Sequence, residues 1–271
     1  MDRIDKFKAI STIPADPVAD IDLINKYSVK TLAPADVFCF SLILCDNEVD
    51  RDIERFTNAS LDKLAPLFLG KSVLFDHRWS AEKQVARLYR TFVEELKEKT
   101  LTGDAKRVLR GSAYMLRTEE NAPLIAAIEG GIKKEVSVGC SMESRICSIC
   151  GGKFQYNWQT GKMLCENNHF MGDKYDGKLC VGDLNDPKDA YEVSFVAVPA
   201  QRGAGVTKGV EDLSEVVELL KTADMDGIPE NDLKTIIQRG QLALAGNDER
   251  AARAKVLAEN EKYLKGTKNN G

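Results

Sequence analysis

The chain has 271 residues, of which 43% are apolar and 30% charged, a composition typical of globular proteins and sufficient for one sizeable domain with an appendage. Its formal net charge of −4 argues against a broad nucleic-acid-binding surface, which normally needs a basic face. No apolar run approaches the roughly 20 residues of a membrane span, and the N-terminal "MDRIDKFKAIS" lacks the apolar core of a secretory signal. We therefore expect a cytoplasmic protein without a membrane segment.

A β-rich body is predicted for the first three quarters of the chain. Residues 1–30 have no clear period and are interpreted as an arm or an edge element. The run "SLDKLAPLFLG" predicts a short helix with Ser60 as its N-cap and Gly70 as its stop, and "NAPLIAAIEGG" predicts another. Runs of β-branched and aromatic residues predict strands at 36–46, 71–77, 83–95, 107–116, 133–146 and 189–200.

Two segments depart from this pattern. Residues 145–183 are rich in Gly, Asn, Asp, Lys and Cys and have little periodic apolar content, which indicates an insert between two strands. The stretch "QRGAGVTKG" is typical of a linker, and the residues after it combine helical spacing with many charges. We expect a domain at 1–208 that contains the insert 145–183, followed by a helical tail at 209–271.

The insert has the spacing of a metal site. Five of the chain's seven cysteines crowd into or beside it, which in a cytoplasmic protein favours metal binding over disulfides. Cys147 and Cys150 form a C-x2-C pair, and Cys165 and His169 follow as C-x3-H. Two such pairs can close a tetrahedron around Zn²⁺, so these four residues predict a structural zinc site. Cys180 is a spare ligand that could replace His169.

A histidine and two repeated triplets are candidates for chemistry. If His169 binds zinc, His77 is the one histidine left for acid–base work near neutral pH, although a histidine at the end of an apolar run is also explained by loop contacts. The triplet Glu-Val-Ser occurs at 135–137 and again at 192–194. In a strand, the Glu and Ser of each triplet share one face. From the residues alone, a serine in a valine-rich strand is usually a structural residue with a satisfied hydroxyl.

Three motifs resemble one protein family. The stretches "GKSVLFDHRWS", "GIKKEVSVGCS" and "DAYEVSFVAVPAQRGAG" occur in the order and context of the prohead proteases of tailed phages. These are capsid-maturation serine proteases related to herpesvirus assemblin, and the resemblance covers most of the β-rich body. It implies that His77 is the general base, Ser137 the nucleophile and Glu192 the acid that orients the histidine. Ser194 is then structural, and Gly139 is expected to leave room for substrate backbone.

Two other residues compete for these roles. Asp76 lies beside His77 and could orient it, although adjacent residues in a strand point to opposite faces. Cys140 could be a cysteine nucleophile, but free cysteines are commonly buried.

The resemblance also implies a fold and partners. It implies an α+β fold with a β-rich, barrel-like protease core and flanking helices, to which this chain adds the zinc insert and the helical tail. It implies scaffold and major capsid proteins as substrates, inside an assembling prohead in the host cytoplasm, with self-cleavage. The charge and the lack of an apolar span predict no nucleic-acid or membrane partner, and self-association stays open. Two other classes stay open as well: a non-catalytic, zinc-stabilised capsid-assembly or scaffold protein of the same fold, and a zinc-dependent hydrolase.

Overall fold

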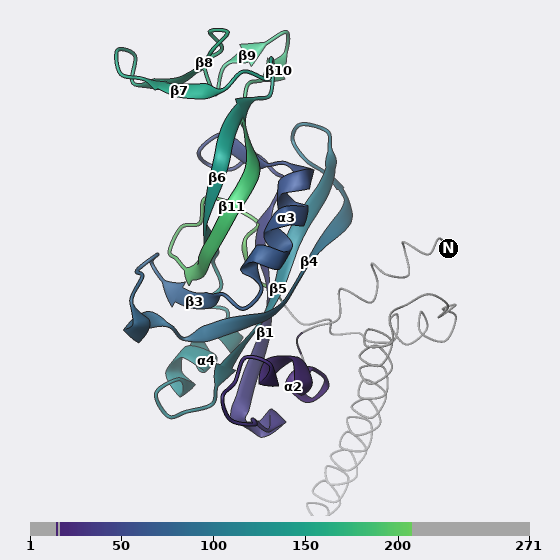
Figure 1. Ribbon diagram of the computed structural model, residues 1–271, viewed down its shortest axis with the longest axis vertical. Coiled ribbons are helices and arrows are strands. Elements are labelled where there is room, and N and C mark those ends of the chain that lie inside the picture. Colours follow the sequence, from purple (N-terminus) through teal and green to yellow (C-terminus); the bar gives the residue numbers. More distant parts are fainter. Residues whose placement is uncertain (1–14, 16, 208–271) are drawn as a thin grey trace, which may run out of the picture. The chain divides into compact units, whose positions relative to one another are not determined.

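A computed structural model of the chain describes residue 15 and residues 17–207 (Figure 1). The predicted tail at 209–271 and the first half of the predicted arm lie outside the described residues. Within the described part, no helix is long and apolar enough to cross a membrane. The helices are α2 (Pro17–Asn25), α3 (Asn58–Phe68), α4 (Ala122–Glu129) and the short 3₁₀ turns η1 (Pro34–Asp36) and η2 (Ala81–Lys83). The strands are β1 (Val37–Asp46), β2 (Glu54–Phe56), β3 (Ser72–Phe75), β4 (Ala86–Lys99), β5 (Ala105–Leu116), β6 (Val136–Cys147), β7 (Phe154–Asn157), β8 (Lys162–Cys165), β9 (Lys174–Tyr175), β10 (Lys178–Leu179), β11 (Gly182–Phe195) and β12 (Gly205–Val206).

One mixed sheet of eight strands organises the body. Its order is β12-β1-β5-β4-β3-β11-β2, and β6 pairs with β11 outside this path. Most pairs are antiparallel, but β11 runs parallel to both β2 and β3. The expected β-rich α+β fold is thus confirmed. The expected barrel is not closed by continuous strand pairing, because β12 has only two residues and reaches the start of β6 through a single bridge between Glu135 and Gly205.

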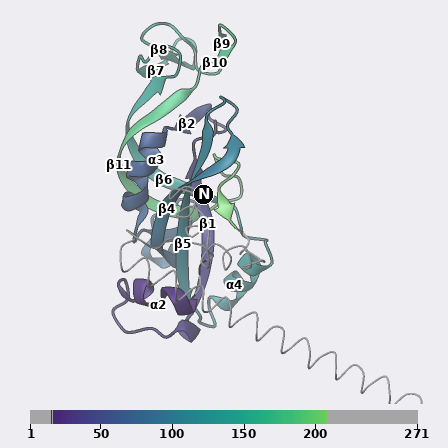
Figure 2. The same ribbon diagram turned by 90° about the vertical axis from the view of Figure 1, so that its right-hand side faces the viewer.

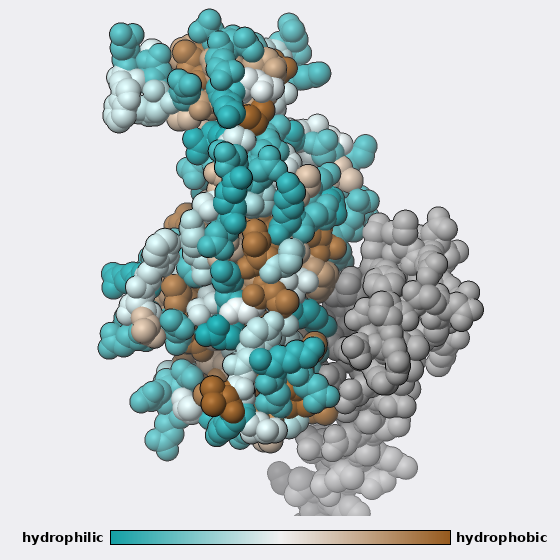
Figure 3. All heavy atoms as spheres, viewed as in Figure 1, coloured by the Kyte–Doolittle hydropathy of each residue, from teal (hydrophilic) through white to brown (hydrophobic). Residues whose placement is uncertain are grey.

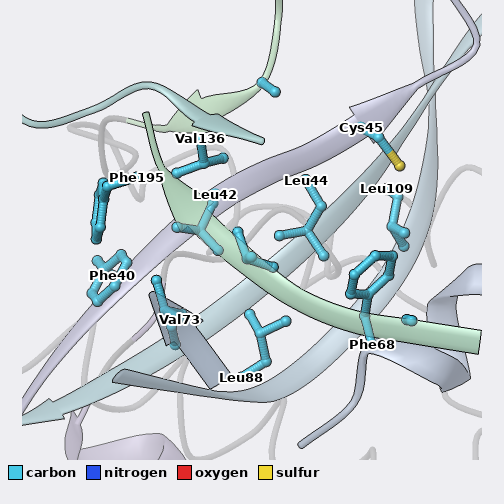
Figure 4. Close-up of a cluster of buried hydrophobic side chains, with 14 of the residues drawn as sticks. Phe40, Leu42, Leu44, Cys45, Phe68, Val73, Leu88, Leu109, Val136 and Phe195 are labelled. Atoms are coloured by element: carbon cyan, nitrogen blue, oxygen red, sulfur yellow. The ribbon is translucent and has the colours of Figure 1, made fainter. Parts of the chain in front are cut away.

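The core lies on one face of this sheet. Figure 4 shows Phe40, Leu42 and Leu44 of β1 on the same side, as the period of two along a strand requires. Helix α3 adds Phe68 to this cluster, and Phe195 adds the end of β11. Each such side chain stabilises the fold by about 1.5–3 kcal/mol relative to its exposed state. The core therefore fixes the strands whose opposite faces carry the polar residues described below.

Two local predictions need correction. Helix α3 begins at Asn58 and not after Ser60, because the hydroxyl of Thr57 accepts the Ser60 amide at 3.2 Å and so caps the helix. Part of the predicted arm is helix α2, in which Ile24 is fully buried in a second cluster of apolar residues. Tertiary contacts stabilise α2, and its own weak periodicity could not reveal it.

The strands β6 and β11 form a long ribbon that carries the cysteine-rich insert. They pair from Val136 opposite Phe195 to Cys147 opposite Gly182. Both views show the hairpins β7–β8 and β9–β10 at the far end of this ribbon, away from the body (Figures 1 and 2). The hairpin region is largely hydrophilic on the face seen in Figure 3, with few apolar side chains between the polar ones. The predicted insert is thus a separate small module joined to the body by two strands.

Candidate functional site

A left-handed turn after β3 positions His77. The strand β3 ends at Phe75, and the next two residues, Asp76 and His77, both have φ of 53°. This region is uncommon for residues other than glycine, although Asp and His adopt it more readily than most. Backbone bonds fix the turn, because Asp76 N donates to Phe195 O at 3.0 Å and Arg78 N to Phe75 O at 3.0 Å. His77 therefore leaves the strand and turns toward β11.

The imidazole of His77 contacts the carboxylate of Glu192. Its Nδ1 lies 2.7 Å from Glu192 Oε1, and the side chains are 43% and 3% exposed, respectively. With Glu192 ionised, Nδ1 carries the proton and donates it to this hydrogen bond, so Nε2 keeps a free lone pair. The pairing of β3 with β11 places Phe75 beside Phe195, and the turn that follows brings His77 back to Glu192. A buried acid that orients an exposed histidine is the arrangement of a general base.

Ser194 locks both members of this pair. Its hydroxyl is fully buried and donates to Glu192 Oε2 at 2.5 Å. Ser194 Oγ also accepts the backbone N–H of His77 at 3.1 Å. One hydroxyl thus fixes the second carboxylate oxygen and the backbone turn that presents the imidazole.

Gly139 makes the room that the carboxylate occupies. It lies opposite Glu192 in the β6–β11 register, and a Cβ at this position would stand 2.4 Å from Glu192 Oε1. The sequence predicts that this glycine leaves space for substrate backbone. The structure assigns the space to the Glu192 side chain instead.

Ser137 lies beside this network without joining it directly. Its Cα partner in the register is Ser194, and directly opposite residues of an antiparallel pair point to the same face of the sheet. Ser137 is half-buried, whereas Ser194 is fully buried. Among residues 17–207, the Ser137 hydroxyl makes no side-chain hydrogen bond, to His77 or to any other group. The structure therefore joins His77 to Glu192 and places Ser137 on the same face of the neighbouring strand.

The two rival residues are less suited to these roles. Asp76 lies in the turn and not in the strand, and among the described residues the acid that contacts His77 Nδ1 is Glu192. Burial raises the pKa of the Cys140 thiol to about 11, and the negative charge of Glu192 adds to this effect. The thiol of Cys140 is therefore protonated at neutral pH, and a protonated thiol is a poor nucleophile.

An open pocket borders Glu192. It has a volume of about 370 Å³. Trp79 and Tyr191 line it, with ring centroids 5.2 Å apart, and the buried Leu74 lines it as well. No pattern in the sequence connects these two aromatics, since Trp79 follows the turn and Tyr191 belongs to another strand.

The predicted metal ligands converge at the far end of the ribbon. The donor atoms of Cys147, Cys150, Cys165 and His169 all lie within 4.8 Å of one another, so these residues could hold a metal ion. The Sγ atoms of Cys150 and Cys165 are 3.6 Å apart, and His169 Nδ1 lies 3.6 Å from Cys165 Sγ and 3.8 Å from Cys147 Sγ. The spare thiol, Cys180, also reaches the cluster, with its Sγ 3.5 Å from that of Cys147.

Backbone and side-chain N–H groups surround the sulfurs. Asn167 Nδ2 donates to Cys150 Sγ at 3.3 Å, and the His169 amide donates to Cys165 Sγ at 3.3 Å. The bond from Asn167, followed by one from the backbone of Gly152, lowers the pKa of Cys150 to about 6. Such donors around thiolates are the outer contacts that orient and stabilise metal-bound sulfur.

Two comparisons with known proteins were made. A scan against protein-family models finds no match, and a search of curated proteins finds none either.

Proposed function

We propose that the chain is a serine endopeptidase in which Ser137 is the nucleophile, His77 the general base and Glu192 the acid that orients the histidine. The contact of 2.7 Å between His77 and the buried Glu192 carboxylate carries this proposal. A serine hydroxyl is a poor nucleophile until a neighbouring base takes its proton, and the carboxylate holds the imidazole in the tautomer that leaves Nε2 free to do so.

The two serines on this face differ in what their hydroxyls are free to do. The Ser194 hydroxyl already donates to Glu192 and accepts from the His77 backbone, and it is fully buried. The half-buried Ser137 hydroxyl has no such commitments among the described residues. The proton of Ser137 is available for transfer to a base, which favours it as the nucleophile. Since apo geometry at catalytic sites is often loose, the lack of a direct bond to His77 is compatible with this role.

The unpaired edge of β6 favours a peptide as the substrate. The amide of Val196 donates to Glu135 O, and that of Val206 to Lys134 O on the other side. Because backbone groups alternate direction along an antiparallel strand, those of Val138 point away from β11. Between the bridges at Glu135 and Ile146, this edge has no strand partner in the described part of the chain. An extended peptide can pair with such an edge directly beside Ser137.

The resemblance of the three motifs to prohead proteases supplies the biological context of the proposal. The substrates are then scaffold and major capsid proteins, together with the chain itself, inside the assembling prohead in the host cytoplasm. The single-sheet, β-rich body is compatible with this family.

We also propose that the cysteine cluster holds a structural Zn²⁺. With Zn–S bonds near 2.3 Å and Zn–N bonds near 2.0–2.1 Å, tetrahedral angles require S···S separations of about 3.8 Å and S···N separations of about 3.6 Å. The 3.6 Å between Cys150 and Cys165, and the 3.6 and 3.8 Å from His169 to its two sulfurs, agree with these values. The small apolar cluster around them, with Phe154 as its one buried aromatic, offers little other stabilisation.

The donor set disfavours the zinc-dependent hydrolase. A catalytic zinc keeps one position open for water. Here three thiols and a histidine fill a tetrahedral shell, and Cys180 lies next to them as a fifth donor. A non-catalytic, zinc-stabilised assembly protein remains the second candidate, and the absence of a hydrogen bond from Ser137 to His77 among residues 17–207 is the observation that favours it.

Covalent labelling separates these candidates. A fluorophosphonate probe should modify the wild-type protein, and peptide mapping should place the label on Ser137. The Ser137→Ala and His77→Ala variants should lose labelling and self-cleavage, while Ser141→Ala, a control on the same strand, should keep both. Labelling at no serine, or cleavage that survives Ser137→Ala, would reject the endopeptidase and favour the assembly protein.

A further inference from the structure

The pocket beside Glu192 has apolar walls that the fold itself does not use. Trp79 is 72% exposed and Tyr191 41% exposed, although both are large aromatic residues. The two rings contact each other at a tilt of 57°, so they form a continuous apolar wall, and the buried Leu74 supplies a floor. Exposed aromatic surface grouped in a concave site is typical of a binding site, whereas isolated exposed apolar residues are ordinary.

The charged groups around this pocket are already paired. Lys71 Nζ lies 3.3 Å from Asp189 Oδ1, and Glu192 is bonded to both His77 and Ser194. Two polar side chains of the lining are also bonded to each other, since Ser72 Oγ donates to Gln84 Oε1 at 3.0 Å. The lining therefore meets a ligand with polar groups that are already bonded within the protein. Its uncommitted surface is that of the two rings and the leucine.

We propose that this pocket, bounded by Trp79, Tyr191 and Leu74 and here named the Trp79 pocket, is a specificity site that binds a large apolar side chain, aromatic or long aliphatic. The inference rests on the proposed function in naming the ligand as a residue of a peptide substrate. Glu192 lines the pocket and orients His77, so a side chain seated there brings its peptide next to the general base. An apolar side chain buried against the rings would fix the register of that peptide relative to His77.

A cleavage profile tests the specificity. A defined mixture of synthetic peptides should be cut preferentially where a large apolar residue occupies one fixed position near the scissile bond. In Trp79→Ala and Tyr191→Ala, the preference for Phe or Leu over Ala at that position should fall about tenfold or more, as a hydrophobic pocket discriminates by about 10–200-fold. The Trp158→Ala variant removes an exposed tryptophan of the distant β7–β8 module and should keep the wild-type profile. A preferred charged residue, or equal profiles for Trp79→Ala and Trp158→Ala, would overturn the inference.

A binding measurement keeps the inference independent of catalysis. The chain has two tryptophans, so Trp79 is the one fluorophore of this type in Trp158→Phe. Its emission should shift to shorter wavelength, saturably, with a capped Gly-Phe-Gly tripeptide, and should not respond to capped Gly-Ala-Gly or Gly-Glu-Gly. The absence of any saturable response to the phenylalanine peptide would refute the pocket even if Ser137 is labelled. A response in a protein whose Ser137 resists fluorophosphonate would support the pocket and reject the endopeptidase.

Discussion

Replacing Gly139 by alanine should displace the Glu192 carboxylate and so misalign His77. The added Cβ would stand 2.4 Å from Glu192 Oε1 and 3.2 Å from its Cδ, whereas ordinary contacts begin near 3.4 Å. The carboxylate must therefore move by about 1 Å, from 2.4 to about 3.4 Å of separation. A shift of that size stretches the bond of 2.7 Å to His77 and the bond of 2.5 Å from Ser194 beyond normal limits.

Two magnitudes follow from this displacement. Overpacking at a buried site costs about 1–3 kcal/mol of stability, and the Glu192 side chain is only 3% exposed. Loss of the orienting carboxylate costs up to about 10⁴ in kcat in the Ser-His-Asp proteases, so we expect fluorophosphonate labelling of Ser137 to slow by about 10²–10⁴-fold in Gly139→Ala. Urea unfolding measures the stability, and the labelling rate measures the activity.

A double-mutant cycle with Glu192→Ala isolates the contact. Once the carboxylate is gone, the new methyl group meets no obstacle, so Gly139→Ala should cost almost nothing in that background. It should even stabilise slightly, since alanine is favoured over glycine in a strand by about 0.5–1 kcal/mol. If Gly139→Ala costs the same free energy of unfolding in both backgrounds, the carboxylate does not occupy this space and the reasoning is wrong.

Three further expectations concern the rest of the network and the fold. Ser194→Ala removes a hydrogen bond to the Glu192 carboxylate, so urea unfolding should give a loss of about 1.5–3 kcal/mol, with labelling of the nucleophile about tenfold slower; full stability and rate would contradict the locking role. Metal analysis of protein purified without added zinc should give about one equivalent for wild type and Cys180→Ser but none for Cys147→Ser. Zinc that is kept by Cys147→Ser and lost by Cys180→Ser would place Cys180 among the ligands instead. Burial raises the pKa of Tyr89 well above its ordinary value, and the negative charge of Asp20 on α2 raises it further. The contribution of Tyr89 to stability is therefore complete below about pH 10 and is lost as the pH rises above that value. Tyr89→Phe should lose the hydrogen bond to that carboxylate, about 1 kcal/mol at pH 7, and should flatten the decline in unfolding free energy between pH 10 and 11; an unchanged decline would contradict this reasoning.

The long strands could be predicted from the sequence because their residues report burial directly. The run 36–46 became β1 almost unchanged, since alternate side chains enter the core. The three-residue β2 could not be predicted, because its Glu54 and Arg55 are charged and are held by ion pairs with Arg145 and Asp183. Such pairs connect residues far apart in the chain, and local patterns carry no signal for them.

The metal ligands and the histidine were found by different kinds of signal. C-x2-C and C-x3-H spacing reflects local loop geometry, so the four ligands predicted from it meet in space. His77 was expected at the end of a strand but lies in a left-handed turn, which depends on bonds to Phe195 and Ser194 of another strand. The position of the histidine relative to Glu192 is thus a tertiary fact that spacing alone could not give.

The two Glu-Val-Ser triplets acquire different environments because they occupy different places in the sheet. The strand β11 has β3 on one side and β6 on the other, so Glu192 and Ser194 are buried and must satisfy each other. The strand β6 has a strand partner only on its β11 side over the described residues near Ser137. Glu135 there is half-exposed and pairs with its neighbour Lys134. A central strand can hold a carboxylate rigidly, because burial removes competing water, whereas an edge strand can present a hydroxyl to an incoming chain. Identical triplets therefore fit an orienting acid in one strand and a nucleophile in the other.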